Sequence, residues 1–138
     1  MNYGRVILGG LVAGLVMNAG EFLLNGVILH KTMVEWASLH NFPAEPAPSF
    51  MVVAIGLTFV LGIVMVWLYA LIRPRMGPGP KTAIVAALVL WFAIYFYVGI
   101  IYGILLVQPM NAIAIAAVFG LVEYIVAAIA GAWVYKEV

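Results

Sequence analysis

The chain has 138 residues, of which 67% are hydrophobic and only 8% are charged. Soluble domains are nearer half apolar and a quarter charged, so a chain of this composition cannot bury its apolar surface in a water-soluble fold. Its main solvent must be lipid. The sequence contains no cysteine, which excludes disulfides, thiolate nucleophiles and cysteine-ligated metals.

Four apolar runs follow one another along the chain, and each has the roughly 20 residues that a helix needs to cross about 30 Å of hydrocarbon. They cover residues 6–29, 50–72, 83–107 and 112–135. Strands of a membrane barrel would be shorter and would alternate in character. The sequence therefore predicts a single all-α domain, residues 1–138, built as a four-transmembrane-helix bundle. A signal peptide is the alternative for the first run, but the run is too long, and Met17 and Asn18 are poor residues before a cleavage site.

The first run carries polar residues in the middle of its apolar sequence. Their spacing of four, four, three and four places them on one face of a helix. They are Gly10, Gly14, Asn18, Glu21 and Asn25. Glycines four residues apart let another helix approach closely, and the polar half of the face is unfit for lipid. We therefore expect this face to meet protein or water.

The longest polar stretch, residues 30–49, follows the first run. Thr32 and Glu35 match a capping box, and apolar residues follow at roughly helical spacing. We expect a short amphipathic helix over residues 32–40 on the outer membrane surface, with Trp36 at headgroup level. The stretch also contains four possible metal ligands: His30, Glu35, His40 and Glu45. Their spacing matches no known ligand motif, so we expect a solvated loop and no metal site.

The connection between the second and third runs, residues 73–81, reads RPRMGPGPK. Its three prolines and two glycines predict a tight turn without helix. The Lys-Thr that ends GPGPKT is reminiscent of a phosphate loop, but prolines take the place of the required N–H donors. Positive charge gathers on one side of the four-helix weave, at Arg5, Arg73, Arg75, Lys81 and Lys136, with only Lys31 on the other. Short loops rich in Lys and Arg stay cytoplasmic, so we expect both termini there.

The third run is aromatic, and its Gly99-x-x-x-Gly103 spacing favours a close helix contact. Its rings are Trp91, Phe92, Tyr95, Phe96, Tyr97 and Tyr102. Packing is the usual role of such rings, and a pocket for a flat hydrophobic molecule is the alternative. Because no histidine lies within a run, haem is unfavourable, and we expect no cofactor.

The fourth run repeats the pattern of the first. Small and polar residues recur at helical spacing: Gly120, Glu123, Tyr124, Ala127 and Gly131. At about 1.5 Å per residue, Glu21 lies about 12 Å and Glu123 about 17 Å from the outer ends of their helices. The two acids thus have comparable depth, and they can face one another or a common cavity.

Acids at this depth need partners, because a charged group near the bilayer centre costs roughly 3 kcal/mol on insertion scales. No Lys or Arg lies within a helix core. The remaining partners are Asn18, Asn25, Tyr95, Tyr102, Tyr124, the backbone, water, an ion or another chain. We favour polar contacts that fix the register of the helices. A carboxylate that carries protons or binds a cation is the main alternative, and a metal site is the third.

Three stretches carry a resemblance that spans the chain: the opening GRVILGGLVAGLVMNAGEFLLN, the turn RPRMGPGPKT and the ending GLVEYIVAAIAGAWVYKE. With them the chain resembles a group of uncharacterised small bacterial membrane proteins with four helices. The resemblance implies a multi-pass protein, which we place in the bacterial inner (cytoplasmic) membrane, and it implies no activity. Small multidrug transporters also have four short helices with a Glu in the first, but that likeness is architectural only.

No Ser/His or paired-Asp catalytic arrangement occurs in the helix cores, so we expect no enzyme. The leading hypothesis is a structural or accessory membrane subunit that acts through helix contacts, as a homo-oligomer or in a larger membrane complex. Its partners would be the lipid bilayer and protein, and not nucleic acid. The alternative is a small proton- or cation-coupled transporter or channel that uses Glu21 and Glu123.

Overall fold

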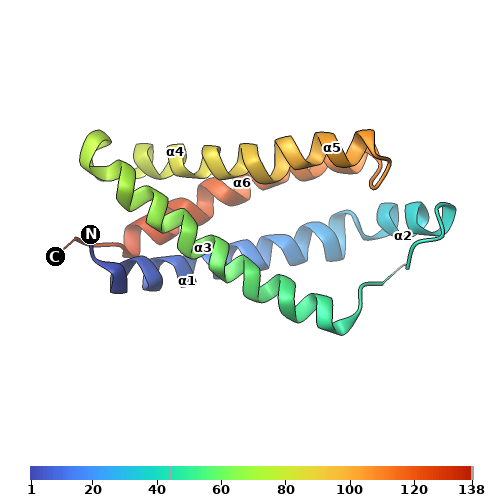
Figure 1. Ribbon diagram of the computed structural model, residues 1–138, viewed down its shortest axis with the longest axis horizontal. Coiled ribbons are helices and arrows are strands. Elements are labelled where there is room, and N and C mark those ends of the chain that lie inside the picture. Colours follow the sequence, from blue (N-terminus) through green and yellow to red (C-terminus); the bar gives the residue numbers. More distant parts are fainter. Residues whose placement is uncertain (44, 138) are drawn as a thin grey trace.

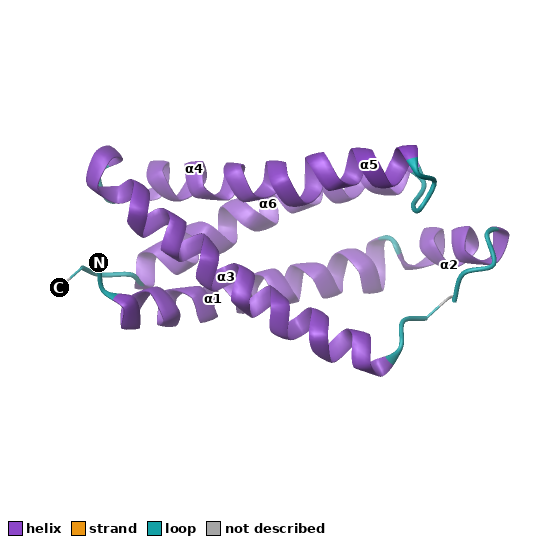
Figure 2. Ribbon diagram, in the orientation of Figure 1, coloured by secondary structure: helices purple, strands orange, loops and turns teal. Residues whose placement is uncertain are grey.

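The computed structural model describes residues 1–43 and 45–137, which form helices joined by short connections (Figures 1 and 2). No strand occurs within these described ranges. Four helices in them are long and apolar enough to cross a membrane: Tyr3–Ile28, Pro48–Met76, Pro80–Ile104 and Met110–Val134. The all-helical fold with four helices of membrane-spanning length is therefore confirmed.

The first span consists of α1, Tyr3–Leu23, and the π-helix η1, Leu24–Ile28. Asn2 caps it, because its side-chain oxygen accepts a hydrogen bond from the backbone N–H of Arg5 at 3.1 Å. The span therefore begins three residues before the predicted run and ends within it.

Helix α2, His30–Leu39, follows η1 almost without interruption. A helix in this loop was predicted, but the capping box of Thr32 and Glu35 was wrong, since the helix has already begun at His30 and no side chain caps it. The reason is that Leu29 is still helical in backbone conformation. Its carbonyl accepts the N–H of Met33 at 2.9 Å, so the first turn has backbone acceptors and needs no cap.

Helix α3, Pro48–Met76, runs further than the sequence predicted. The expectation that residues 73–81 exclude helix was wrong, because α3 continues through Pro74. A proline removes its own N–H bond and its ring crowds the carbonyl four residues before it, but close to the end of a helix this is tolerated, and the helix closes beyond it where Gly77 N–H bonds the Arg73 carbonyl at 2.8 Å. The turn itself is made by Gly77 and Gly79, whose φ angles of 84° and 125° lie in the region that favours glycine.

The third span is built from α4, Pro80–Trp91, the π-helix η2, Phe92–Tyr97, and α5, Val98–Ile104. The fourth is the unbroken helix α6, Met110–Val134. Pro80 stands in the first turn of α4, where its missing N–H has no intrahelical partner to lose. The three later spans thus differ from the predicted runs by a few residues at each end.

Both termini lie at one end of the bundle, which we call the terminal end, and α2 lies at the other, the α2 end (Figure 1). Helix α1 packs on α3 and on α6, and α6 packs on α4. The best-buried side chains include Ala13, Met65, Ala83 and Ala127, all fully inaccessible to solvent. Towards the α2 end, α3 diverges from α4 and α5 (Figure 1). The bundle is therefore tight at the terminal end and looser at the α2 end.

Glycines make the tight contacts possible. A Cβ on Gly10 would lie 2.4 Å from Ile63 Cα, and one on Gly14 would lie 2.9 Å from Phe59 Cα, so both glycines face α3. On the α6 side, a Cβ on Gly131 would lie 2.9 Å from the carbonyl oxygen of Gly9. Ala127 is fully buried in the same core. Gly99 and Gly103 instead receive side chains of α6, chiefly Ile113 and Met110.

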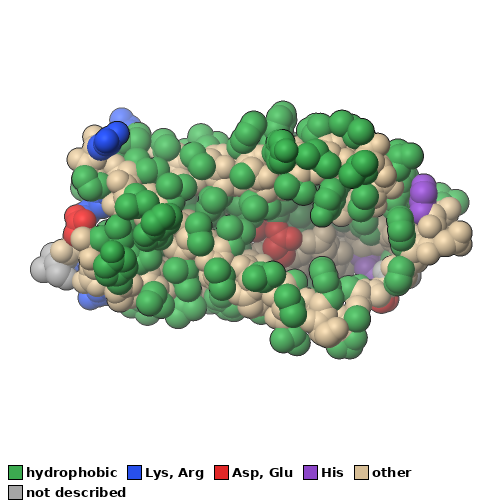
Figure 3. Space-filling model, in the orientation of Figure 1, with side chains coloured by type: hydrophobic (Ala, Val, Ile, Leu, Met, Phe, Trp, Pro, Cys, Tyr) green, Lys and Arg blue, Asp and Glu red, His purple; other side chains and the backbone are tan. Residues whose placement is uncertain are grey.

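The face of the molecule drawn in Figure 3 is almost entirely apolar along its length. Lys and Arg side chains on this face lie at the terminal end and His side chains at the α2 end. Acidic side chains are visible at the bottom of a hollow near the middle. On this face, charge is therefore confined to the ends of the bundle and to the acids in the hollow.

Candidate functional site

Glu21, near the end of α1, is held by two donors. Its Oε1 accepts a hydrogen bond from the hydroxyl of Tyr95 in η2, and its Oε2 accepts one from Asn25 Nδ2 at 2.9 Å. Asn25 also donates to the backbone carbonyl of Glu21 at 3.1 Å. One donor therefore comes from the same span and the other from the third span, across the bundle.

Glu123 meets Glu21 from α6. Its side chain is 6% exposed, and its carboxyl group lies within electrostatic range of that of Glu21. The contact is possible because Gly20 leaves room: a Cβ there would lie 2.7 Å from the Cγ, Cδ and Oε2 atoms of Glu123. Among the described residues, no donor bonds either oxygen of Glu123. The two acids that the sequence placed at comparable depth thus lie together, but only Glu21 has hydrogen-bond donors.

Two tyrosines complete the site. The ring of Tyr124 meets that of Tyr95 edge-on, with centroids 5.2 Å apart. Tyr95 is seated against Gly120, where a Cβ would lie 2.4 Å from the ring. Tyr124 is 2% exposed and lies within electrostatic range of both acids. Sequence reasoning named Tyr95 only as one of several partners. The signal in the sequence is Gly120, one turn before Tyr124, because a residue without a side chain leaves room for a bulky ring.

Both spans that supply a donor to Glu21 are π-helical at or beside that donor: Asn25 lies in η1 and Tyr95 in η2. A π-helical turn takes up an extra residue, which rotates everything beyond it by about 100° relative to an ideal α-helix. The direction in which the Tyr95 side chain points, towards Glu21, therefore depends on η2. π-helical segments are rare overall, but those that do occur are often found at functional sites. Neither η1 nor η2 contains a proline, so no feature of the sequence predicted them.

Asn18 lies apart from this cluster. Its Nδ2 donates to the Gly14 carbonyl at 2.9 Å and lies 3.5 Å from the Ile55 carbonyl, so it ties α1 to α3. Asn25 is exposed at the surface of the bundle, and Tyr102 is 41% exposed. The predicted polar face of α1 is therefore split between a contact with α3, the acid pair and the surface.

The loop residues considered as metal ligands lie at the α2 end, away from the acids. His30 and Glu45 are 3.7 Å apart, and Lys31 pairs with Glu35 at 4.0 Å. His40 stacks on Trp36 with ring centroids 3.9 Å apart. Within residues 1–43 and 45–137, no group of three or more His, Asp or Glu side chains is arranged to hold a metal ion.

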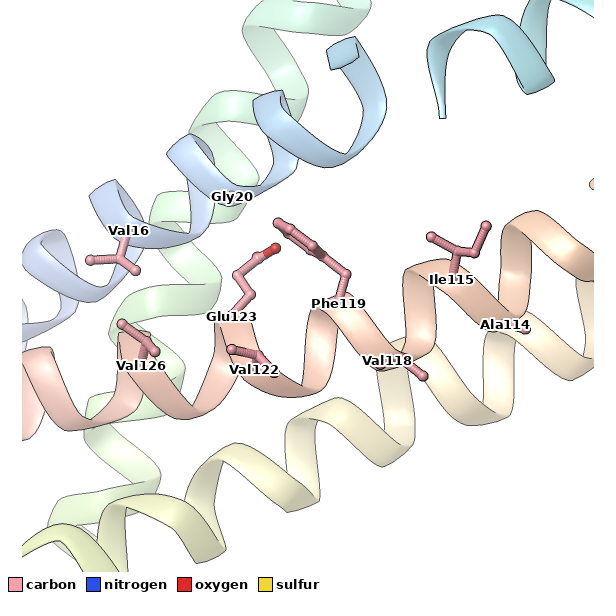
Figure 4. A pocket seen from close by; sticks show the side chains of 9 residues that line it. All are labelled: Val16, Gly20, Ala114, Ile115, Val118, Phe119, Val122, Glu123 and Val126. Atoms are coloured by element: carbon pink, nitrogen blue, oxygen red, sulfur yellow. The ribbon is translucent and has the colours of Figure 1, made fainter. Parts of the chain in front are cut away.

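A cleft of about 750 Å³ opens beside Glu123, between α1 and α6 (Figure 4). Its lining residues are Val16 and Gly20 from α1 and, from α6, Ala114, Ile115, Val118, Phe119, Val122, Glu123 and Val126. Val118, Val122 and Val126 are 69%, 61% and 50% exposed, so the cleft opens onto the apolar outside of the bundle. Glu123 is the ionisable residue of this lining.

Comparison with protein families, with curated proteins and with solved structures finds no match for this chain. The function is therefore argued from the chemistry of the site. That chemistry is two neighbouring carboxyl groups, with tyrosine and asparagine donors on one of them and an apolar cleft beside the other.

Proposed function

We propose that this protein is a small multi-pass membrane carrier that binds a proton or a cation at the Glu21–Glu123 pair. One observation carries the proposal: Glu123 is buried against a second carboxyl group and receives no hydrogen bond from a described donor. Two acids in contact in a medium of low dielectric constant do not both ionise alone. A proton or a cation must offset one of their two charges.

This geometry favours the carrier over the structural subunit that led the sequence-based hypotheses. A polar residue that only fixes helix register is expected to find donors in the core, because an unsatisfied buried polar atom costs about 1–3 kcal/mol. Apart from a proton shared with Glu21, Glu123 has none among the described residues, and it borders a cleft that is open to the outside of the bundle. Those are properties of a binding group.

A second candidate rests on Glu21. The hydrogen bond from Tyr95 joins α1 to η2, two segments that otherwise make little backbone contact. An acid in that position stabilises the arrangement of the spans, as expected of a structural subunit in a homo-oligomer or a larger membrane complex. Under this candidate the pair is a static link, and no cargo binds there.

We further propose the setting of the carrier. The protein lies in a bacterial cytoplasmic membrane with both termini cytoplasmic, and α2 rests at the outer surface as an amphipathic helix. Support comes from the Lys and Arg side chains at the terminal end in Figure 3 and from Trp36, whose Nε1 donates to the Val107 carbonyl at 3.2 Å. That bond ties α2 to the connection between α5 and α6.

Flux in liposomes tests the proposed function. The protein is reconstituted with a pH-sensitive dye inside, a pH gradient is imposed, and the membrane potential is clamped with potassium and valinomycin. We expect proton flux above that of empty liposomes, lost in Glu21→Gln and Glu123→Gln while the melting temperature in detergent stays within a few degrees. Glu35→Gln, on exposed α2, is the control and should match wild type.

The structural candidate makes the opposite prediction. It requires no flux in wild type, tolerance of Gln at both positions, and a clear loss of thermal stability in Glu21→Leu, because Tyr95 and Asn25 would lose their acceptor. That combination of results would replace the carrier by the subunit.

A further inference from the structure

The cleft beside Glu123 joins an apolar wall to a single acidic group. Apolar side chains of α1 and α6 line most of it, and the carboxyl oxygen of Glu123 points towards α1 beside the ring of Phe119 (Figure 4). Its volume of about 750 Å³ lies within the usual range for small-molecule sites. Such sites are mostly apolar with a few placed polar groups, and this cleft has that composition.

We propose that this cleft binds a lipophilic organic cation, whose charge lies against Glu123 and whose apolar groups lie against the valines. The inference rests on the proposed function and names its cargo class. Entry is sideways from the bilayer, because Val118, Val122 and Val126 form an exposed rim on the outside of α6. A lipophilic cation concentrates in the membrane interface, next to that rim.

Other ligand classes fit less well. An anion would meet two carboxyl groups and no Lys or Arg side chain in the lining. A small metal ion needs several oxygen or nitrogen ligands, and no group of three or more is arranged for it in the described part of the chain. A lipid tail would pack against the apolar lining of the cleft but leave both oxygens of Glu123 without a counter-charge.

Binding of the cation is coupled to loss of a proton. The titratable groups that face Glu123 are Glu21 from α1, Tyr95 from η2 and Tyr124 on α6 itself, and no basic side chain is among them. When the cation offsets one of the two carboxylate charges, the proton that the pair had held is released, so one positive charge enters and one leaves. Affinity should therefore fall as the pH is lowered.

Tetraphenylphosphonium and tetraphenylborate test this proposal because they are nearly equal in size and opposite in charge. Binding to the full-length protein in detergent is measured by calorimetry, with proton release followed in weak buffer. We expect the phosphonium to bind with release of about one proton and the borate not to bind specifically. Glu123→Gln should weaken phosphonium binding at least tenfold, with no proton release.

A second variant addresses the shape of the cleft without touching the acids. Val126→Phe fills the cleft and should also weaken binding at least tenfold. Val60→Phe is the matched control, because Val60 is 53% exposed, close to the 50% of Val126, and lies on α3 away from the cleft. Melting temperatures establish that each variant is folded.

Two results would overturn the inference: equal binding of both probes, or phosphonium binding that survives both Glu123→Gln and Val126→Phe. If Glu-dependent proton flux occurs but the phosphonium does not bind, the cargo class is wrong and the carrier stands. If the phosphonium binds as expected but no Glu-dependent proton flux is found, the cleft is a binding site and the carrier proposal fails.

Discussion

The hydroxyl of Tyr95 donates the hydrogen bond that links the third span to Glu21. Tyr95→Phe keeps the ring against Gly120 and Tyr124 but removes that donor, leaving one oxygen of Glu21 without its partner. We expect a loss of stability of about 1 kcal/mol, the usual scale for a hydrogen bond between membrane helices. Thermal unfolding in detergent, followed by circular dichroism, measures it.

Tyr97→Phe is the control for this substitution, since Tyr97 lies in the same π-helix and is 58% exposed. It should leave the melting temperature unchanged. Equal effects of the two substitutions would show that the Tyr95 hydroxyl contributes nothing to the link between the spans.

At the scale of single residues, the sequence predicted part of the site. The depth of Glu21 and Glu123 followed from counting along two apolar runs, and both runs carry small residues at helical spacing. The selection of Tyr95 among several aromatic residues could not follow from that counting. It depends on η2, which shifts the phase of the third span, and π-helical turns leave no mark in composition.

At the scale of the elements, the close crossing of α1 and α3 depends on glycine residues. A Cβ on Gly62 would lie 2.4 Å from the Gly10 carbonyl oxygen and 2.5 Å from the Gly14 backbone nitrogen. Both are backbone atoms that cannot move without separating the helices. We expect Gly62→Ala to destabilise the protein by about 1–3 kcal/mol, as overpacking does, in a thermal or denaturant melt in detergent.

Gly56→Ala provides the comparison within α3. Nothing lies within 4 Å of a Cβ at that position, so alanine should be neutral or stabilising by up to about 1 kcal/mol through its higher helix propensity. The two substitutions thus have opposite expected signs on one helix. A Gly62→Ala protein as stable as wild type would mean that the helices do not approach this closely.

The sequence predicted which segments are helical better than it predicted where those helices end and what they contact. Apolar runs of about 20 residues leave little choice but spans, because the lipid-exposed backbone must satisfy its own hydrogen bonds. The extension of α3 through Pro74 was missed because a single lost N–H bond near a helix end is tolerated. Gly62 was missed as a packing residue because its partners, Gly10 and Gly14, are remote in sequence.

The molecule as a whole places its acid pair at a border. Towards the terminal end the helices approach through glycine and alanine, and Met65 and Ala127 are fully buried. Towards the α2 end, α3 diverges from α4 and α5 (Figure 1). The acid pair thus lies between a tightly packed half of the bundle and a half in which α3 diverges from α4 and α5.

Single cysteines can establish how the whole molecule lies in the membrane. Because the chain has no cysteine, Ser38→Cys, Lys81→Cys and Lys136→Cys each introduce a single thiol, and all three positions are exposed. With both termini cytoplasmic, an impermeant maleimide should label Ser38→Cys in intact cells, and the other two only after the membrane is opened. The bias of Lys and Arg towards the terminal end is the physical reason.

The reverse pattern, with Lys81→Cys and Lys136→Cys labelled in intact cells, would invert the molecule and turn the open half of the bundle towards the cytoplasm. Labelling of all three in intact cells would mean that the reagent enters, so a cytosolic protein with a known exposed cysteine is assayed alongside. The orientation matters for the proposed carrier, because it decides which side of the membrane the α2 end of the bundle faces.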